Sequence, residues 1–389
     1  MLKARLALSV GALVAVVLLI EAGLRFAPPI PTDKLLPFPY NSGRVEQIVA
    51  GDTYLRFDGY LGWVPAPNFV RRSSGQVFRT NGVGMRAERE YPFDAPAGVA
   101  RIAAFGDSFT YCAEVTQDAC WVTQLETAWP GTEILNYGVP GYGPDQAWLR
   151  YQRDGRPYAP CAVLIGYFVE DIDRVVSRFR PFVSPDDSVI MSKPRFLLDG
   201  DGLELLPNAV TTPSQVEDAA WVEATLGPHD AWYFPGTFVE GPFDGSRLVR
   251  HARTAAYRRA QASLVRGDRR YPLYDDEQEA YQVTGRILIE FAEQVRSDGA
   301  MPVVIVLPGE RDLRGYRDGI RVYDRLLAWL SEAGVTTIDL MDVLAQEQEH
   351  RDIRELFADG RHYSAAGNAV VARSLAETLP SLVGSTCRE

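Results

Sequence analysis

The sequence predicts an α/β fold in which a parallel β-sheet is covered by helices on both faces. From Arg101 onward, short apolar runs alternate with segments whose apolar residues recur at helical spacing. The runs are apolar at nearly every position, which is typical of strands buried on both faces, whereas half-exposed strands alternate apolar and polar residues. Ligands of such folds bind beyond the carboxyl ends of the strands, so we look for site residues there.

Each expected element follows from its own pattern. The expected strands are, in chain order, 101–107 (RIAAFGD), 132–139 (TEILNYGV), 161–169 (CAVLIGYFV), 301–309 (MPVVIVLPG) and 335–344 (VTTIDLMDVL). The expected helices are 117–129, 145–155, 279–299, 323–334 and 364–383. The third of these helices ends at a glycine, the residue type that most often follows a helix end.

The charge and the cysteine content exclude some classes of function. The formal net charge is -11 over 389 residues, and binding to DNA or RNA needs a basic face, so no nucleic-acid partner is expected. No CxxC pair or histidine-rich cluster indicates a metal site, and no cofactor is predicted. The cysteines either pair in an oxidising compartment or are buried thiols, and their spacing leaves both alternatives open; they are Cys112, Cys120, Cys161 and Cys387.

The N-terminus has the pattern of a membrane anchor or a signal peptide. Lys3 and Arg5 precede an uncharged run over 6–20. No small-x-small cleavage site follows, which favours an uncleaved anchor. If the helix continues to residue 26, Glu21 and Arg25 are four apart and can pair at the far interface. The positive-inside rule places the first two cations in the cytoplasm and the bulk of the chain outside it.

Composition divides the chain into four parts. Residues 1–27 are the anchor, and 28–99 form a proline-rich linker and an N-terminal extension of short strands and turns. The α/β domain takes 100–172 and 276–389. Residues 173–275 form an insertion or cap, because a structureless loop of that length is improbable inside a compact domain. The aromatic residues of the insertion either stack on sugar rings or fill its core; they are Trp221, Trp232, Tyr233 and Phe234.

Two segments at the expected strand ends carry residues for nucleophilic catalysis. Ser108 follows the first strand in FGDSFT, and His362 precedes the last helix in FADGRHYSAAGN. Asp359 lies three residues before the histidine, a spacing that lets its carboxylate reach the imidazole. Alone, the serine is equally explained as a helix N-cap, and the D-x-x-H pattern as a surface turn. Together they predict a nucleophile, a base and a group that orients the base.

Four blocks of the chain resemble those of the SGNH/GDSL hydrolase superfamily. They are FGDSFT after the first strand, NYGVPGYG after the second, FVEDID after the third and DGRHYSAAGN near the end, in the order of that superfamily. The resemblance covers 100–383 apart from the insertion. The segments EAGLRF, GYLGW and NGVGMR also resemble membrane-anchored bacterial members, some of whose relatives act on O-acetyl groups of extracellular polysaccharides as esterases or acetyltransferases.

The resemblance implies a three-layer αβα, flavodoxin-like fold with a serine hydrolase site. Ser108 would be the nucleophile, His362 the general base and acid, and Asp359 its orienting group. The oxyanion hole would use the backbone N–H groups of Ser108 and of Gly141, which takes the place of the second-block glycine. Asp107 is expected to stabilise the nucleophile turn rather than to react.

One position departs from the pattern of the superfamily. Its third block usually supplies an Asn whose side chain donates a hydrogen bond to the oxyanion, and Glu170 stands in that place, followed by Asp171. An ionised carboxylate accepts hydrogen bonds but donates none. Loss of one such donor costs about two to three orders of magnitude in rate. Weakened or absent hydrolysis is therefore expected, unless Glu170 is kept protonated or another group donates.

Two functions follow from these observations. The first is an extracytoplasmic, membrane-anchored serine esterase or O-acyltransferase that acts on acylated carbohydrate; the sequence does not decide between hydrolase and transferase. The second is a catalytically inactive SGNH-like domain that serves as a structural or accessory subunit of a membrane protein complex. The expected location is the bacterial inner membrane, with a single pass and the bulk of the chain in the periplasm. The expected partners are the membrane, an acylated polysaccharide and subunits of a membrane complex.

Overall fold

The structure is a computed structural model, and it describes residues 2–26, 34–40, 54–73, 76–185, 191–264, 272–316, 319, 321–359 and 361–387. Residue 27 of the expected anchor, 28–33 of the expected linker and 41–53 of the expected extension lie outside the described residues. The centre of the molecule is a five-stranded parallel sheet. Its strands are β5 (Ala100–Gly106), β6 (Thr132–Asn136), β7 (Ala162–Phe168), β10 (Met301–Leu307) and β11 (Thr337–Asp339).

The sheet has the strand order β11-β10-β7-β5-β6. Counted in chain order, this is the 2-1-3-4-5 arrangement of flavodoxin-like folds. The predicted α/β fold class is therefore confirmed. Strand β7 is buried at every position and β5 and β10 at all but the first, as expected for a sheet covered on both faces.

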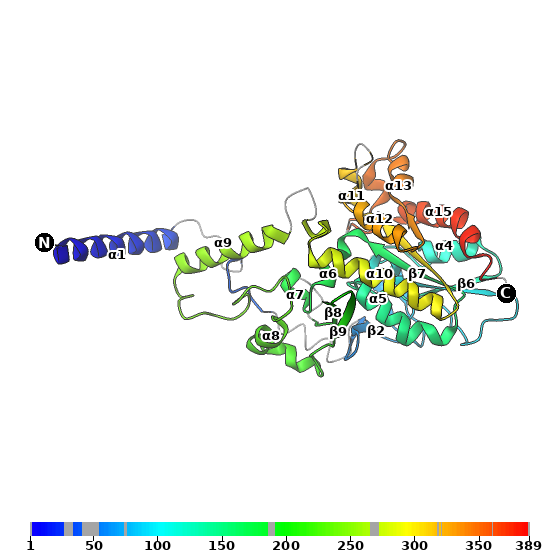
Figure 1. Cartoon of the computed structure of the whole chain (residues 1–389), viewed down its shortest axis with the longest axis horizontal. Coiled ribbons are helices and arrows are strands. Elements are labelled where there is room, and N and C mark those ends of the chain that lie inside the picture. Colours follow the sequence, from blue (N-terminus) through cyan, green and yellow to red (C-terminus); the bar gives the residue numbers. More distant parts are fainter. Residues whose placement is uncertain are drawn as a thin grey trace.

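Helices cover the two faces of the sheet (Figure 1). On one face α15 packs against α4, α13 and α14, and on the other α10 packs against α5 and α12. The bounds of these helices are α4 (Trp121–Ala128), α5 (Pro144–Arg150), α10 (Glu279–Ser297), α12 (Asp324–Glu332), α13 (Met341–Glu347), α14 (Ile353–Leu356) and α15 (Ala365–Val383). A π-helical turn (Tyr151–Gly155) and a 3-10 turn (Arg156–Tyr158) continue α5.

The remaining elements are short, apart from three helices. The strand pairs are antiparallel: β1 (Leu55–Asp58) with β2 (Gly62–Pro65), β3 (Val70–Ser73) with β4 (Gln76–Arg79), and β8 (Arg195–Asp199) with β9 (Gly202–Leu206). The helices are α1 (Leu2–Phe26), α3 (Ser108–Tyr111), α6 (Ile172–Val175), α7 (Arg180–Val183), α8 (Ala219–Leu226), α9 (Arg247–Leu264) and α11 (Glu310–Gly315). The 3-10 turns are η4 (Val169–Asp171), η5 (Pro213–Glu217) and η6 (Pro272–Tyr274).

Helix α1 projects from the rest of the molecule at one end, as Figure 1 shows. Among the described residues, its segment Arg5–Phe26 is the one helix long and apolar enough to cross a membrane, and none of it is buried inside the protein. The predicted ion pair is present, with Arg25 Nε 2.9 Å from Glu21 Oε1. A helix of this kind is compatible with the predicted anchor.

Glu21 also joins α1 to α9, a helix more than 200 residues away in the sequence. Its carboxylate accepts hydrogen bonds from the backbone N–H groups of Arg247 (3.0 Å) and Leu248 (2.9 Å) and from the Ser246 hydroxyl. These donors belong to the first turn of α9, where N–H groups have no partner within the helix. Helix α9 therefore begins at the end of α1 and lies between it and the α/β domain (Figure 1).

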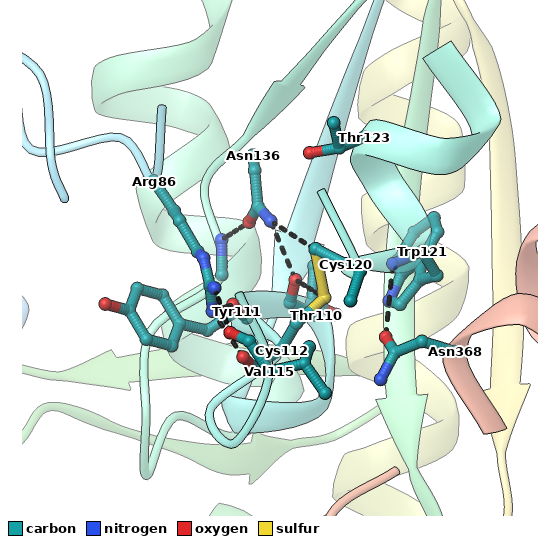
Figure 2. The surroundings of a disulfide bond; sticks show 12 residues. Arg86, Thr110, Tyr111, Cys112, Val115, Cys120, Trp121, Thr123, Asn136 and Asn368 are labelled. Carbon is teal, nitrogen blue, oxygen red and sulfur yellow. Dashed lines mark hydrogen bonds between the residues drawn. A yellow bond between two sulfur atoms is a disulfide. The ribbon is translucent and has the colours of Figure 1, made fainter. Parts of the chain in front are cut away.

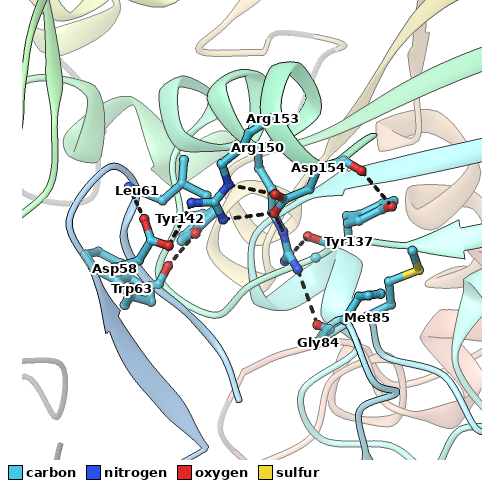
Figure 3. A network of polar contacts seen from close by, with 12 residues as sticks. Asp58, Leu61, Trp63, Gly84, Met85, Tyr137, Tyr142, Arg150, Arg153 and Asp154 are labelled. Atoms are coloured by element: carbon cyan, nitrogen blue, oxygen red, sulfur yellow. Dashed lines mark hydrogen bonds and ion pairs between the residues drawn. The ribbon is translucent and has the colours of Figure 1, made fainter. Parts of the chain in front are cut away.

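The N-terminal extension packs on the loop that follows β6 (Figure 3). The Tyr142 hydroxyl donates to the Trp63 carbonyl (2.5 Å), and the Trp63 indole donates to the Pro140 carbonyl (3.0 Å). Buried Arg150 connects the same two parts, because its guanidinium donates to the carbonyls of Tyr137 (2.8 Å) and Gly84 (3.3 Å). The domain boundaries themselves stay predictions.

All cysteines are paired. One disulfide joins Cys112 to Cys120 and the other joins Cys161 to Cys387. The sequence left open whether these residues are disulfides or thiols, and the structure gives the first alternative. The second bond ties the chain after α15 to the residue before β7, so it closes a loop with a sequence separation of 226.

Removing this long-range bond is expected to destabilise the protein more than removing the short one. The double variant Cys161→Ser/Cys387→Ser should lose about 4–5 kcal/mol of unfolding free energy, because the entropy that a crosslink removes from the unfolded chain grows with loop length. Cys112→Ser/Cys120→Ser, which opens a separation of 8, should lose about 2–3 kcal/mol. Chemical denaturation in detergent measures both losses. Equal losses would contradict the loop-length argument.

Candidate active site

The nucleophile turn is built at the carboxyl end of β5. Gly106 has φ +153°, and a side chain there would clash with the Gly166 carbonyl and with Thr110. Asp107 caps the four-residue helix α3, since its Oδ1 accepts from the Phe109 N–H at 2.8 Å. Ser108 is the first residue of that helix, and its own N–H has no partner within the helix. Asp107 thus has the stabilising place that the sequence predicted.

His362 approaches Ser108 from the other end of the chain. It lies two residues before Ser364, which caps α15. The first turn of α15 is tied to α4 by Asn368, whose side chain accepts from the Trp121 N–H (3.1 Å) and donates to the Tyr363 carbonyl (3.0 Å). The Tyr363 hydroxyl donates to the carbonyl of Pro308 beyond β10 (2.7 Å). These contacts fix the backbone beside the imidazole.

The structure brings Ser108 and His362 into hydrogen-bond contact. His362 Nε2 lies 2.8 Å from Ser108 Oγ. On the other side of the ring, Nδ1 lies 2.9 Å from Oε2 of Glu114, and the same oxygen accepts from the His362 backbone N–H at 3.1 Å. Ser108 is 7% exposed, so its hydroxyl is nearly enclosed. The three side chains form the nucleophile–base–orienter series that acyl transfer requires.

The expectation that Asp359 orients the histidine is corrected. Asp359 lies in an exposed turn, and Glu114 takes the place at Nδ1. The physical reason is the backbone turn at 358–362, in which the Ala358 N–H donates to the His362 carbonyl (2.8 Å) and Arg361 has φ +73°. No local motif marks Glu114 as a site residue. Its position six residues after the nucleophile, between two cysteines, was the available signal.

The role of Gly141 as an oxyanion donor stays a prediction. Gly141 has φ +85°, a conformation that favours glycine. Within the described residues, the N–H groups of Gly138, Val139 and Tyr142 are used in hydrogen bonds and that of Gly141 is not. Gly138 is a glycine for a steric reason, because a Cβ there would lie 2.3 Å from the Tyr111 nitrogen of α3. The flanking glycine is thus needed for packing.

Arg174 connects the nucleophile turn with the loop that carries Gly141. Its Nη1 lies 3.1 Å from Asp107 Oδ2 and 2.5 Å from Asp171 Oδ1, and it donates to the Tyr142 carbonyl at 2.6 Å. Both carboxylates are almost fully buried. Burial raises the pKa of Asp171 well above its usual range, although the guanidinium of Arg174 acts in the opposite direction. The cation compensates the buried acids and holds two parts of the site together.

Glu170 lies in the 3-10 turn η4 after β7, beside Asp171. Its side chain is half-buried. The expected weakening of hydrolysis by this residue stays a prediction.

Arg174→Gln is expected to lower the unfolding free energy by about 3 kcal/mol, because it leaves two buried carboxylates without their cation. Arg153→Gln is the matched control. Arg153 pairs with Asp58 at 2.7 Å, with its side chain 35% exposed, so its loss should cost less than about 1 kcal/mol (Figure 3). Chemical denaturation in detergent checks both values. Equal losses in the two variants would contradict a structural role for the buried cation.

The aromatic residues of the insertion are largely used in packing. Trp232 is 4% exposed, and its indole donates to the Asp173 carbonyl at 2.9 Å. Tyr233 contacts the Phe182 ring, and Phe234 contacts the Tyr257 ring. These contacts favour the alternative that the residues fill the core of the insertion.

Comparison with known proteins gives matches among solved structures. No family model and no curated protein matches the chain. It is similar to a lipolytic protein of the G-D-S-L family from Veillonella parvula, with 12% identity over 73% of this chain and 100% of the other at a TM-score of 0.37. It is also similar to an α/β hydrolase from the Lake Arreo metagenome, with 13% identity over 75% of this chain and 98% of the other at a TM-score of 0.40. A third similar structure is an acetylxylan esterase from Geobacillus stearothermophilus, with 12% identity over 74% of this chain and 97% of the other at a TM-score of 0.38.

Proposed function

We propose that this protein is an extracytoplasmic, membrane-anchored serine esterase or O-acyltransferase of acylated carbohydrate, of the SGNH/GDSL type. One observation carries the proposal: His362 Nε2 is 2.8 Å from Ser108 Oγ, while Nδ1 is 2.9 Å from the Glu114 carboxylate. A serine that only caps a helix is not expected to contact a histidine. A histidine with a purely structural role is not expected to have a serine hydroxyl at one ring nitrogen and a carboxylate at the other. The carbohydrate substrate is supported by the sequence resemblance and by what the acetylxylan esterase is named for.

The reaction follows from the roles of these atoms. Ser108 Oγ attacks the acyl carbonyl carbon and passes its proton to His362 Nε2. Glu114 accepts from Nδ1–H and stabilises the imidazolium that forms. The N–H groups of Ser108 and Gly141 donate to the oxyanion. The C–O bond to the alcohol then breaks, and the alcohol leaves with the proton from Nε2. Water or a sugar hydroxyl gives its proton to Nε2 and attacks the acyl-enzyme. The bond from the acyl carbon to Oγ breaks, Oγ takes the proton back from Nε2, and the free acid or the acylated sugar leaves.

The membrane anchor gives this chemistry its location. Helix α1 crosses the inner membrane once, with Lys3 in the cytoplasm and the active site in the periplasm. Two disulfides support an oxidising compartment. The partners are then the membrane, an acylated polysaccharide at its outer face, and membrane proteins that deliver or receive the acyl group.

Acyl-enzyme trapping tests the proposal. The full-length protein in detergent is mixed with p-nitrophenyl acetate, with and without an oligosaccharide acceptor, and quenched for mass spectrometry. An acetyl group on Ser108, with free acetate as the product, indicates an esterase. Faster turnover and acetylated sugar on addition of the acceptor indicate a transferase. A folded protein that releases no p-nitrophenol above the Ser108→Ala background would contradict both.

The alternative is a catalytically inactive subunit of a membrane complex, and Glu170 favours it because a carboxylate replaces the expected amide donor. Extraction in mild detergent followed by sizing distinguishes the two functions. The enzyme is expected to turn over substrate as an isolated chain. The alternative requires co-migrating membrane proteins and no Ser108-dependent turnover, so an active monomer excludes it.

A further inference from the structure

Arg86, at the end of the NGVGMR segment of the N-terminal extension, reaches the turn that follows α3, beside Tyr111, Cys112 and Val115 (Figure 2). Its side chain is among the most buried in the protein, at 1% exposure. Its Nη1 donates to the carbonyls of Tyr111 and Cys112, and its Nη2 donates to the Val115 carbonyl at 2.6 Å. Its Nε donates to the Gln117 side chain at 3.1 Å. Every polar nitrogen of the guanidinium therefore contacts one short stretch of chain.

The carbonyl of Tyr111, the last residue of α3, has no partner within the helix, whereas the Cys112 carbonyl also accepts from the Val115 N–H at 3.4 Å. Cys112 follows α3 with φ +59° and turns the chain sharply, so the helix cannot continue. A buried carbonyl without a donor costs about 1–3 kcal/mol. A cation at a helix C-terminus is also favoured by the helix dipole. Arg86 supplies both the donors and the charge.

The stretch held in this way carries the acid of the triad. Glu114 lies between Cys112 and Val115, whose carbonyls both accept from the guanidinium. The disulfide to Cys120 closes the same turn, as Figure 2 shows. The Glu114 side chain is 27% exposed, and its Oε2 contacts both the imidazole and the backbone N–H of His362. Its 2.9 Å contact with His362 Nδ1 depends on where the backbone of this turn is fixed.

We infer that Arg86 is a positioning residue of the active site: it fixes the backbone on both sides of Glu114 and so sets the orienting carboxylate at His362. The inference rests on the proposed function. The N-terminal extension then contributes to catalysis, since Arg86, the residue that positions Glu114, comes from outside the α/β domain. Ser108 is the first residue of α3, and Arg86 positions Glu114 in the turn that follows this helix.

The test uses the full-length protein in detergent and steady-state kinetics on p-nitrophenyl acetate. Arg86→Lys keeps the charge but replaces a planar fork of donors with one ammonium. We expect Arg86→Lys and Arg86→Gln to lower kcat about 10- to 100-fold with KM changed less than about 3-fold, a moderate share of the loss seen when an orienting acid is removed. A loss in kcat at nearly constant KM separates a positioning role from a loss of substrate binding.

The decisive comparison is made in the Glu114→Gln background. There Arg86→Lys should lower kcat by less than about 2-fold, because two residues that act through one contact are not additive. A full additional loss in kcat would show that Arg86 acts elsewhere and overturn the inference.

Arg101 provides the matched control. It is 2% exposed, donates to the carbonyls of Pro92 and Phe93 of the same extension, and pairs with Glu133, but it lies at the amino end of β5. Arg101→Gln should lose stability, while kcat of the folded protein stays within about 2-fold of the wild type. Failure of both Arg86 variants to fold, with Arg101→Gln folded, would contradict a role in positioning. A wild type without Ser108-dependent turnover overturns the proposed function, and with it this inference.

Discussion

Ser108→Ala is expected to lower kcat for ester hydrolysis by about a million-fold, to the rate that binding and the oxyanion hole alone support. The reason is chemical: Oγ is the atom that His362 Nε2 contacts at 2.8 Å, and alanine has no atom to form the acyl-enzyme. The backbone N–H of residue 108 remains, so the oxyanion donors are kept. Steady-state kinetics on p-nitrophenyl acetate measure the loss.

The fold should survive this substitution. Alanine is a good helix former at the first position of α3, and the Ser108 hydroxyl has only a 3.3 Å contact to Asp107 besides the one to His362. The Tm should therefore stay within about 3 °C of the wild type. Residual activity within 10-fold of the wild type, in a protein with that Tm, would mean that another residue is the nucleophile.

Glu114→Gln is expected to lower kcat about a thousandfold, while Asp359→Asn changes it less than about 2-fold. Replacement of a buried orienting acid by its amide costs about 10⁴ in serine proteases, and partial exposure of Glu114 reduces that loss. Glutamine keeps the size of the side chain but can present an N–H to Nδ1, which favours the wrong tautomer. Asp359 is exposed, so its amide should be tolerated.

The two variants form a matched pair, since each converts one carboxylate into its amide near the same histidine. Kinetics with the active-site concentration titrated by a fluorophosphonate separate a slow enzyme from a smaller folded fraction. The opposite ranking, with Asp359→Asn impaired and Glu114→Gln near the wild type, would restore the assignment that the D-x-x-H spacing suggested.

The sheet could be predicted from the sequence because its strands are continuous apolar runs. Each of the five expected strands contains the observed one to within a residue. The run 335–344 was wrong at its end, because the strand stops at Asp339, whose carboxylate accepts from the Met341 N–H and begins α13. Helix α9 was also missed. It is rich in arginine, and its first turn is capped by Glu21 from the other end of the chain.

The site could be predicted only where the residues stand in recognisable blocks. Ser108 and His362 lie in such blocks, and the structure brings them together. Glu114, the acid, does not lie in such a block. The D-x-x-H spacing instead describes a turn in which Asp359 is exposed to solvent. Glu114 reaches the imidazole through a turn shaped by a disulfide and by Arg86, and neither contact is readable from local spacing.

The proposed function requires Ser108 to be an activated nucleophile in spite of Glu170. Its reactivity is measured by labelling of the full-length protein in detergent with a fluorophosphonate, with the adduct located by mass spectrometry. We expect a single adduct on Ser108, which is absent from Ser108→Ala and strongly slowed in Glu114→Gln. A folded, disulfide-bonded protein that takes no label, or that is labelled on a different serine, would show that Ser108 is not the activated nucleophile.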